Sequence, residues 1–169
     1  MEKNKLNILD VGCGTHKIPG AIGIDVDNCS DADVLHDLNV FPYPFEDNEF
    51  DKVICKQVME HLEKPLDALR EIHRISKPGA TVIIEVPHFS CFYAFCSLHH
   101  KRFFSYFSLD TFIKKYGLFT IEKKLITFHR AHRRWGLALI FNRFPLFYER
   151  FWVFICPAEH IHFELKVKK

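Results

Sequence analysis

The segment Leu6–Asp27 constrains the fold of this chain more than any other part of the sequence. It reads LNILDVGCGTHKIPGAIGIDVD, an apolar run ending in Asp10, a Gly-x-Gly turn, and a second apolar run ending in Asp25. Glycine lacks the Cβ that would hold a ligand away, so a strand leading into such a turn presents bare backbone N–H groups. An acid at the tip of the next strand is placed to accept hydrogen bonds from a ribose diol. The segment therefore predicts a nucleoside site at the carboxyl edge of a parallel sheet.

The spacing argues against a dinucleotide. The dinucleotide fingerprint G-x-G-x-x-G opens a full helix and is followed by an acid about twenty residues further on. Here Lys17 occupies the position of the third glycine, and only ten residues separate Gly14 from Asp25. Asp10 would be a poor neighbour for a pyrophosphate, whereas a cationic aminoacyl group suits it, directly or through a water.

Further motifs follow the glycine turn in a fixed order. They are Asp37-Leu38, a P-F-x-D-N-x-F-D segment at 44–51, Glu-His-Leu at 60–62, and a D-A-L-R-E-I-x-R helix leading to a K-P-G-A turn. The acid-x-Gly-x-Gly pattern resembles the first motif of class I S-adenosylmethionine (SAM) dependent methyltransferases. Residues 34–86 are similar to the methyltransferase domain of the ubiquinone and menaquinone biosynthesis type. The resemblance covers about residues 6–86, roughly half of the chain.

This resemblance implies an α/β fold, a Rossmann-like doubly wound sheet of about seven strands, mostly parallel with an antiparallel C-terminal strand. It implies SAM as cofactor and S-adenosylhomocysteine as product. Asp10, Gly12 and Gly14 would hold the amino acid end of SAM, Asp25 the ribose, and Asp37 with Leu38 the adenine. The full set of expected cofactor-binding residues is Asp10, Gly12, Cys13, Gly14, Lys17, Asp25, Val26, Asp37, Leu38, Gln57 and His61.

Periodicity and turn residues place the elements. Strands are expected near 6–11, 21–25, 33–36, 50–55, 80–86, 119–128 and 161–167, and helices near 64–76 and 108–116. The short apolar runs are typical of a parallel sheet covered on both faces. Ser108 is the expected N-cap of the second helix, and Gly117 follows its end.

The helix after the glycine turn is expected to be unusually short. Thr15–Ile22 leaves room for one turn, because Pro19 and Gly20 already turn the chain back. Such a helix covers less of the ligand, and Lys17 would compensate by reaching the SAM carboxylate. The alternative for Lys17 is a solvated lysine of a loop.

Composition sets outer bounds. A chain of 169 residues suits one domain, here 1–169, with a sizeable core. No apolar run reaches the roughly 18–20 residues that span a bilayer, and a strand begins too early for a signal peptide. The six cysteines form no C-x-x-C pair and are expected to be reduced. We therefore expect a cytoplasmic protein.

The two halves differ in charge. Residues 1–90 carry 9 basic and 16 acidic side chains, whereas residues 91–169 carry 14 and 5, and 15 of the 18 phenylalanines also lie at or after Phe89. The segment 130–157 is rich in Arg, Trp and Phe. It is interpreted as a substrate lid whose arginines meet an anionic group, with a core-packing or dimer segment and a membrane-surface helix as alternatives. These arginines are Arg130, Arg133, Arg134 and Arg143.

Histidines supply the candidate catalytic groups, because their pKa lies near neutrality. His88, after the fifth strand, and His99 are the predicted catalytic residues, with His100 as an alternative to His99 and an ordering role for His61. A structural role is the alternative for each. No ligand spacing supports a metal site made of His88, His99 and His100, so no metal is predicted.

The sequence thus predicts methyl transfer from SAM to an O or N atom of a small-molecule acceptor with an anionic or aromatic part. Two alternatives stay open, a SAM-binding or interaction protein without turnover and a lipid or quinone methyltransferase at a membrane surface. A nucleic acid partner is disfavoured by a pI of about 8.2 and the lack of an RNA-binding module. The oligomeric state and the acceptor are not predicted, because fold does not fix function.

Overall fold

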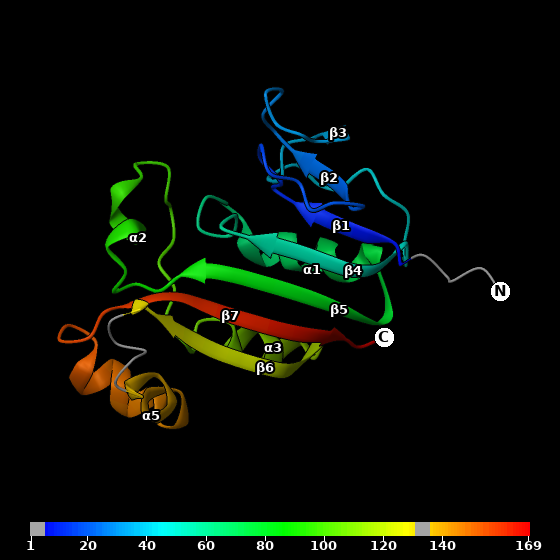
Figure 1. The fold of residues 1–169 in the computed structure, drawn as a ribbon. Helices are drawn as coiled ribbons and strands as arrows, with labels where there is room; N and C mark the ends of the chain where they lie inside the picture. Colours follow the sequence, from blue (N-terminus) through cyan, green and yellow to red (C-terminus); the bar gives the residue numbers. More distant parts are fainter. Residues whose placement is uncertain (1–5, 131–135) are drawn as a thin grey trace.

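Short apolar runs pair into one seven-stranded sheet in the computed structural model, which describes residues 6–130 and 136–169 (Figure 1). The strands are β1 Ile8–Val11, β2 Ile22–Asp25, β3 Val34–Leu35, β4 Phe50–Lys56, β5 Ser76–Pro87, β6 Phe119–Phe128 and β7 Ala158–Val167. The helices are α1 Pro65–Ile75, α2 Phe92–Cys96, α3 Asp110–Tyr116, α5 Leu137–Arg143, α6 Pro145–Phe147 and the π-helical turn η1 Tyr148–Trp152.

The strand order is β3-β2-β1-β4-β5-β7-β6. Strands β1 to β5 pair in parallel, and β7 runs antiparallel to both β5 and β6. The order reverses between β1 and β4, where the connections leave in opposite directions and a crevice opens at the carboxyl ends. The predicted fold class, a doubly wound and mostly parallel sheet with an antiparallel end, is confirmed.

The two edges of the sheet are short or irregular. Strand β3 has two residues, and the pairing of β6 with β7 shifts register between Ile121 and Lys123 and again between Ile126 and Phe128. Such bulges bend and twist an edge strand.

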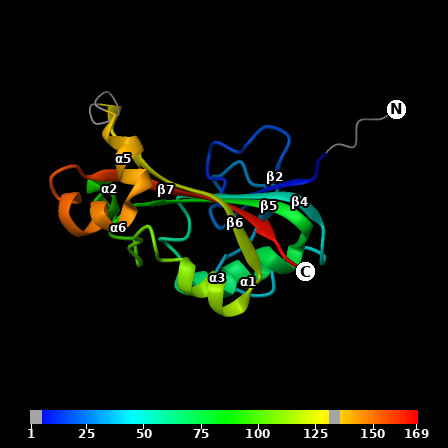
Figure 2. The same cartoon turned by 90° about the horizontal axis from the view of Figure 1, so that it is seen from below.

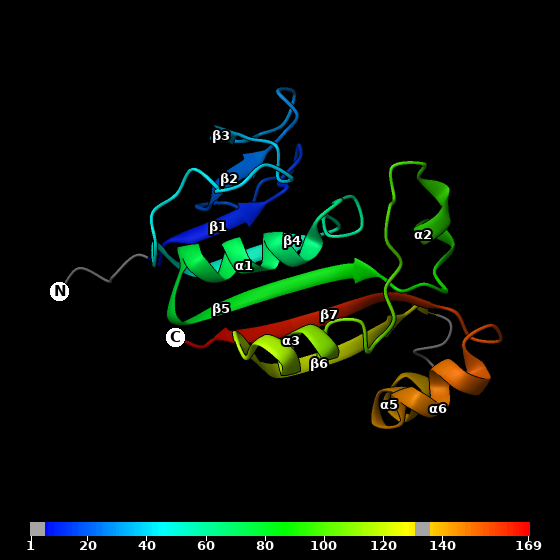
Figure 3. The same ribbon diagram turned by 180° about the vertical axis from the view of Figure 1, so that it is seen from behind.

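Helical cover lies on one face of the central strands. Helices α1 and α3 lie on the same side of the sheet, as the views from below and behind show (Figures 2 and 3). Along β5, Val82, Ile84 and Val86 are buried while Thr81 and Glu85 are partly exposed. Among the described residues, helices thus cover one face of the central strands, while the other face is partly buried, as at Ile54, and partly exposed, as at Thr81 and Glu85.

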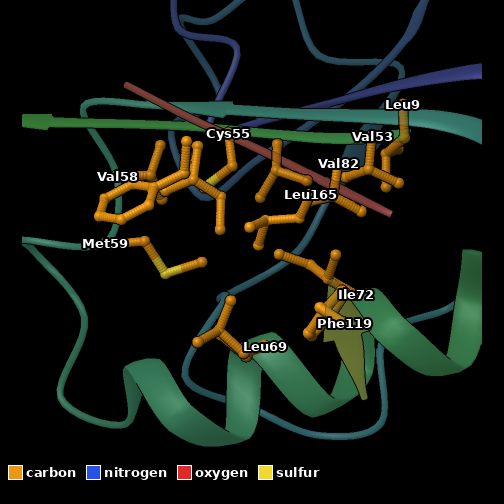
Figure 4. Close-up of a cluster of buried hydrophobic side chains, with 14 of the residues drawn as sticks. Leu9, Val53, Cys55, Val58, Met59, Leu69, Ile72, Val82, Phe119 and Leu165 are labelled. Atoms are coloured by element: carbon orange, nitrogen blue, oxygen red, sulfur yellow. The ribbon is translucent and has the colours of Figure 1, made fainter. Parts of the chain in front are cut away.

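The main core lies between this sheet and α1 (Figure 4). Helix α1 turns Leu69 and Ile72 toward Val53 and Val82 on the central strands, and Leu165 extends the contact to β7. Apolar residues at helical spacing predicted this helix. The same spacing places Leu69, Ile72 and Ile75 on one buried face of it.

Two local expectations differ from the structure. Residues 15–21 form turns and no helix, since Pro19 and Gly20 leave too few residues for a helical turn before β2 begins at Ile22. Helix α3 starts at Asp110 after Leu109, because the Ser108 hydroxyl accepts the N–H of Ser105 at 2.8 Å and does not cap the helix. At its other end Gly117 takes the left-handed conformation expected of it, with φ 65°.

The described part of the 130–157 segment packs on the ends of β6 and β7. Phe141 of α5 and Tyr148 of η1 join Phe128 of β6 in a second buried cluster, with Tyr148 donating to the carbonyl of Cys156 at 2.9 Å. Arg133 and Arg134, expected on a lid, lie outside the described residues. The core-packing alternative accounts for the buried side chains of this segment, and its lid role stays a prediction.

Two phenylalanines test this account of the core. Phe163, in the middle of β7, is completely buried, whereas Phe154 is 84% exposed. Phe163→Ala should lower the free energy of unfolding by about 3–5 kcal/mol, through lost burial and the cavity left behind. Phe154→Ala should change it by less than about 0.5 kcal/mol. Urea unfolding followed by circular dichroism measures both, and equal effects would contradict the assigned core.

Candidate functional site

A pocket of about 320 Å³ opens at the carboxyl edge of the sheet, where the strand order reverses. Its walls come from the turn after β1, the ends of β2 and β3, the loop after β4 and the loop after α2. The lining residues are Gly12, Asp25, Val26, Asp37, Leu38, Asn39, Gln57, Val58, His61, Leu62, His99 and Lys101. Its size is in the range of pockets that hold small ligands and cofactors.

The glycine turn meets the loop after β4 at very short range. Gly12 has φ 66°, and its N–H donates to the carbonyl of Ile24 at 2.8 Å. A Cβ at this position would lie 2.2 Å from Cγ2 of Val58. Only glycine therefore lets the two loops approach and form one wall of the pocket.

Two carboxylates face the pocket from neighbouring strand ends. Asp25 accepts the N–H of Gly14 at 2.9 Å and that of Asp27 at 3.0 Å, so its position is fixed by the turns on either side. Asp37 accepts the N–H of Asn39 at 2.9 Å. The pair is suited to hydroxyl and amino donors of a nucleoside.

Asp10 and Lys17 occupy other places than the sequence suggested. Asp10 is buried beside the pocket, and its carboxylate accepts the N–H of Ile18 at 2.8 Å. Burial raises its pKa, against the lowering effect of that hydrogen bond. Lys17 forms an ion pair with Asp33 at 2.8 Å. Neither side chain lines the pocket, so both act in this structure on the loop that follows Gly14.

The histidines divide into two groups. His99 is exposed and lines the pocket together with the half-buried His61. His88 is completely buried and lies away from the pocket lining: its Nδ1 is 2.8 Å from the hydroxyl of Ser90 and its Nε2 is 3.1 Å from Glu149. The catalytic roles of His88 and His99 stay predictions, and the geometry favours His99.

Of the predicted cofactor residues, the structure brings seven to the pocket wall, Gly12, Asp25, Val26, Asp37, Leu38, Gln57 and His61. Cys13 and Gly14, like Asp10 and Lys17, lie outside the lining. Sequence reasoning missed Asn39, Val58, Leu62 and Lys101. Asn39 directly follows the Asp37-Leu38 motif and Leu62 belongs to the Glu-His-Leu motif, which was the available signal, whereas no sequence pattern indicated that the loop of Lys101 folds back over the pocket.

One buried acid beside the pocket has an unusual environment. Glu60 is 1% exposed, and neither of its carboxylate oxygens has a hydrogen-bond partner among the described residues. Burial raises the pKa of Glu60 to about 7. The pKa of the adjacent His61 is lowered, first by burial and then by the neighbouring His100.

Sequence comparison links this region to known proteins. Residues 9–84 match the family model described as a methyltransferase domain. An uncharacterized methyltransferase of Schizosaccharomyces pombe is 46% identical over 44 residues, which are 26% of this chain and 16% of that protein. The matched parts span less than a quarter of each curated relative.

Solved structures share the fold over nearly the whole chain. A SAM-dependent methyltransferase from Archaeoglobus fulgidus has a TM-score of 0.68 and 17% identity, and the match covers 97% of this chain and 87% of that one. The [4+2]-cyclase SpnF has a TM-score of 0.62 and 17% identity, covering 96% and 74%. At such identities the likeness shows the fold alone.

Residues 9–84 are thus similar to a methyltransferase domain, and the chain as a whole has the fold of the solved structures named above. These likenesses do not distinguish the ubiquinone and menaquinone type, which stays a prediction.

Substituting the glycines tests how the pocket wall is built. Gly12→Ala should lower the free energy of unfolding by about 1–3 kcal/mol more than Gly14→Ala, because Val58 must move in addition to the strain of a positive φ. At Gly14 a Cβ meets nothing within 4 Å. Urea unfolding compares the two, and Val58→Ala added to Gly12→Ala should recover part of the loss. Equal effects of both glycine changes would contradict the close approach.

Proposed function

We propose that this chain is a SAM-dependent methyltransferase that transfers the methyl group to an O or N atom of a small molecule. The observation that carries the proposal is the placement of Asp25 and Asp37 with the Gly12 turn around one pocket at the strand-order reversal. Nucleosides bind at this place in doubly wound sheets. The match of residues 9–84 to the methyltransferase domain supports the assignment.

In this proposal Asp25 accepts hydrogen bonds from the ribose hydroxyls, and Asp37 with Leu38 borders the adenine. The Gly12 turn leaves room for the backbone to approach the amino acid end. Asp10 supports that turn indirectly, since its carboxylate holds the N–H of Ile18. Bound SAM supplies a methyl group already activated by its sulfonium.

The protein's remaining tasks are to align the acceptor, exclude water and take up a proton. Alignment alone contributes several kcal/mol to lowering such a barrier. His99, exposed at the pocket wall, is the proposed general base, a role that typically adds about 10²–10⁴-fold.

Side chains around the opening support an acceptor with an anionic or aromatic part. Lys101 lines the pocket, and its ammonium group forms an ion pair with Glu63 at 2.9 Å. Both side chains are exposed and such pairs are weak, so an anionic acceptor can replace Glu63 as the partner of Lys101. Phe92 and Phe95 of α2, next to the loop of His99, are 76% and 63% exposed. Helix α2 lies beyond the carboxyl end of β5 (Figure 1), so these exposed side chains add apolar surface near that edge of the sheet.

Exposed apolar side chains also favour a second candidate, a lipid or quinone acceptor taken from a membrane surface. Leu139, Phe144 and Phe154 of the 137–155 region are 80%, 55% and 84% exposed, and Arg143 and Arg150 lie among them. Basic and aromatic side chains together can hold a segment at a bilayer surface. Within the described residues, the helices are too short or too polar for a bilayer crossing.

Calorimetric titration of SAM tests the cofactor site. Wild type should bind with micromolar affinity, and Asp25→Ala should weaken binding about 10–100-fold through loss of charge-assisted hydrogen bonds. Asp27→Ala is the matched control, because Asp27 lies two residues further along the same turn and does not line the pocket. The proposal fails if folded wild type does not bind SAM or if both variants bind equally.

Production of S-adenosylhomocysteine tests turnover. Time-dependent production from SAM with a cognate extract is expected for wild type, and His99→Ala should slow it about 10²–10⁴-fold while leaving the affinity for SAM within about threefold. Separating the extract into soluble and membrane fractions distinguishes a small acceptor from a lipid. SAM binding without any product would instead support the alternative of a binding protein without turnover.

A further inference from the structure

Three side chains that can bind metals meet beside the pocket. Glu60 and His61 follow β4, and His100 follows α2. One ligand atom from each, a carboxylate oxygen and two ring nitrogens, lies within 4.8 Å of the other two. The residues come from loops 39 positions apart in the sequence, so no spacing in the sequence indicated the cluster.

The carboxylate of Glu60 is the member that needs a partner. It is 1% exposed, and both of its oxygens lack a hydrogen bond within the described residues. A buried carboxylate is normally paired with a cation or with several donors. Glu60 therefore offers oxygen ligands that the described part of the chain leaves unused.

The histidines are oriented as ligands are. Nδ1 of His100 donates to the carbonyl of Ala94 at 2.9 Å, which fixes the tautomer and leaves the lone pair of Nε2 available. Metal-binding histidines commonly use their second ring nitrogen in this way. The ring of His61 packs edge to face on that of His100, which holds the two imidazoles together.

Backbone contacts hold the two loops together. The carbonyl of Glu60 accepts the N–H of Lys101 at 2.7 Å and that of Arg102 at 3.2 Å. The rings of His61 and His100 meet edge to face with centroids 4.6 Å apart. These contacts bring the three side chains together, and binding an ion would draw their ligand atoms closer.

We propose that Glu60, His61 and His100 form a binding site for a divalent first-row metal ion of the zinc type. Two imidazoles and one carboxylate are a donor set suited to such ions, with ligand distances of about 2.0–2.2 Å. Tetrahedral bonds of this length place ligand atoms about 3.3–3.6 Å apart. Because the atoms here lie within 4.8 Å of one another, the widest pair has to close by at most about 1.5 Å, a movement that side-chain rotation can supply. Because His61 also lines the pocket, the ion would lie at the pocket wall.

Zinc titration of tag-free, chelator-treated protein tests the site. Calorimetry in competition with a chromophoric chelator should give one Zn²⁺ per chain for wild type. Glu60→Gln and His100→Ala should each weaken binding at least about 100-fold, since each removes a ligand. His61 is left unchanged because it belongs to the SAM pocket as well.

Matched controls separate this site from surface binding. His99→Ala, one residue from His100, should bind Zn²⁺ within about threefold of wild type. Cys29→Ser and Cys96→Ser should do the same, because these exposed thiols are the described groups best able to bind zinc adventitiously. Co²⁺ in place of Zn²⁺ should give a visible spectrum without a thiolate charge-transfer band.

Glu60→Gln keeps the proposal testable even if His100→Ala fails to fold, since a neutral amide is close in shape and circular dichroism confirms its folding. The proposal is overturned if wild type shows no stoichiometric binding or if Glu60→Gln binds as well as wild type. All zinc titrations are made without SAM. Absence of zinc binding therefore overturns only the metal site, and absence of SAM binding overturns only the cofactor site.

Discussion

The architecture of this protein depends on the contact between the Gly12 turn and Val58. These residues follow β1 and β4, the adjacent strands at which the sheet order reverses, and a Cβ on Gly12 would lie 2.2 Å from the valine. Because the two loops can approach this closely, the ends of β2 and β3 join the same wall and bring Asp25 and Asp37 to one pocket. The arrangement of Asp25 and Asp37 thus depends on glycine, which has no side chain, at position 12.

Much of this arrangement could be predicted, because parallel strands end at a common edge and their terminal acids must meet there. Asp25 was predicted in this way, whereas Asp37 was expected from the resemblance to SAM-dependent methyltransferases. The hydrogen bond of Asp10 to the N–H of Ile18 was not predicted, because a strand-end acid can also accept a nearby backbone N–H, and the role of Asp10 toward SAM stays a prediction. Lys101 and the surroundings of Glu60 were missed because they depend on how the loop after α2 folds back, a tertiary contact without a periodic signal.

The second half of the chain contributes His99 and Lys101 to the pocket wall and is tied together by a partly buried acid outside the pocket. Glu149 of η1 lies 3.1 Å from the ring of His88 and also accepts the N–H of Tyr106. It thereby connects the end of β5, the loop before α3 and the helical segment that follows β6. Some of the aromatic side chains of this half, which together with its basic residues suggested a substrate lid, instead form a second buried cluster.

The irregular edges of the sheet have a consequence for how this chain meets other copies of itself. An edge strand with free N–H and C=O groups is a template for pairing with another chain. Here one edge strand is only two residues long, and the other is interrupted twice by register shifts, one of them beside Lys123. Neither offers a long, straight ladder, so the molecule can expose many aromatic side chains near its pocket without also inviting strand-by-strand aggregation.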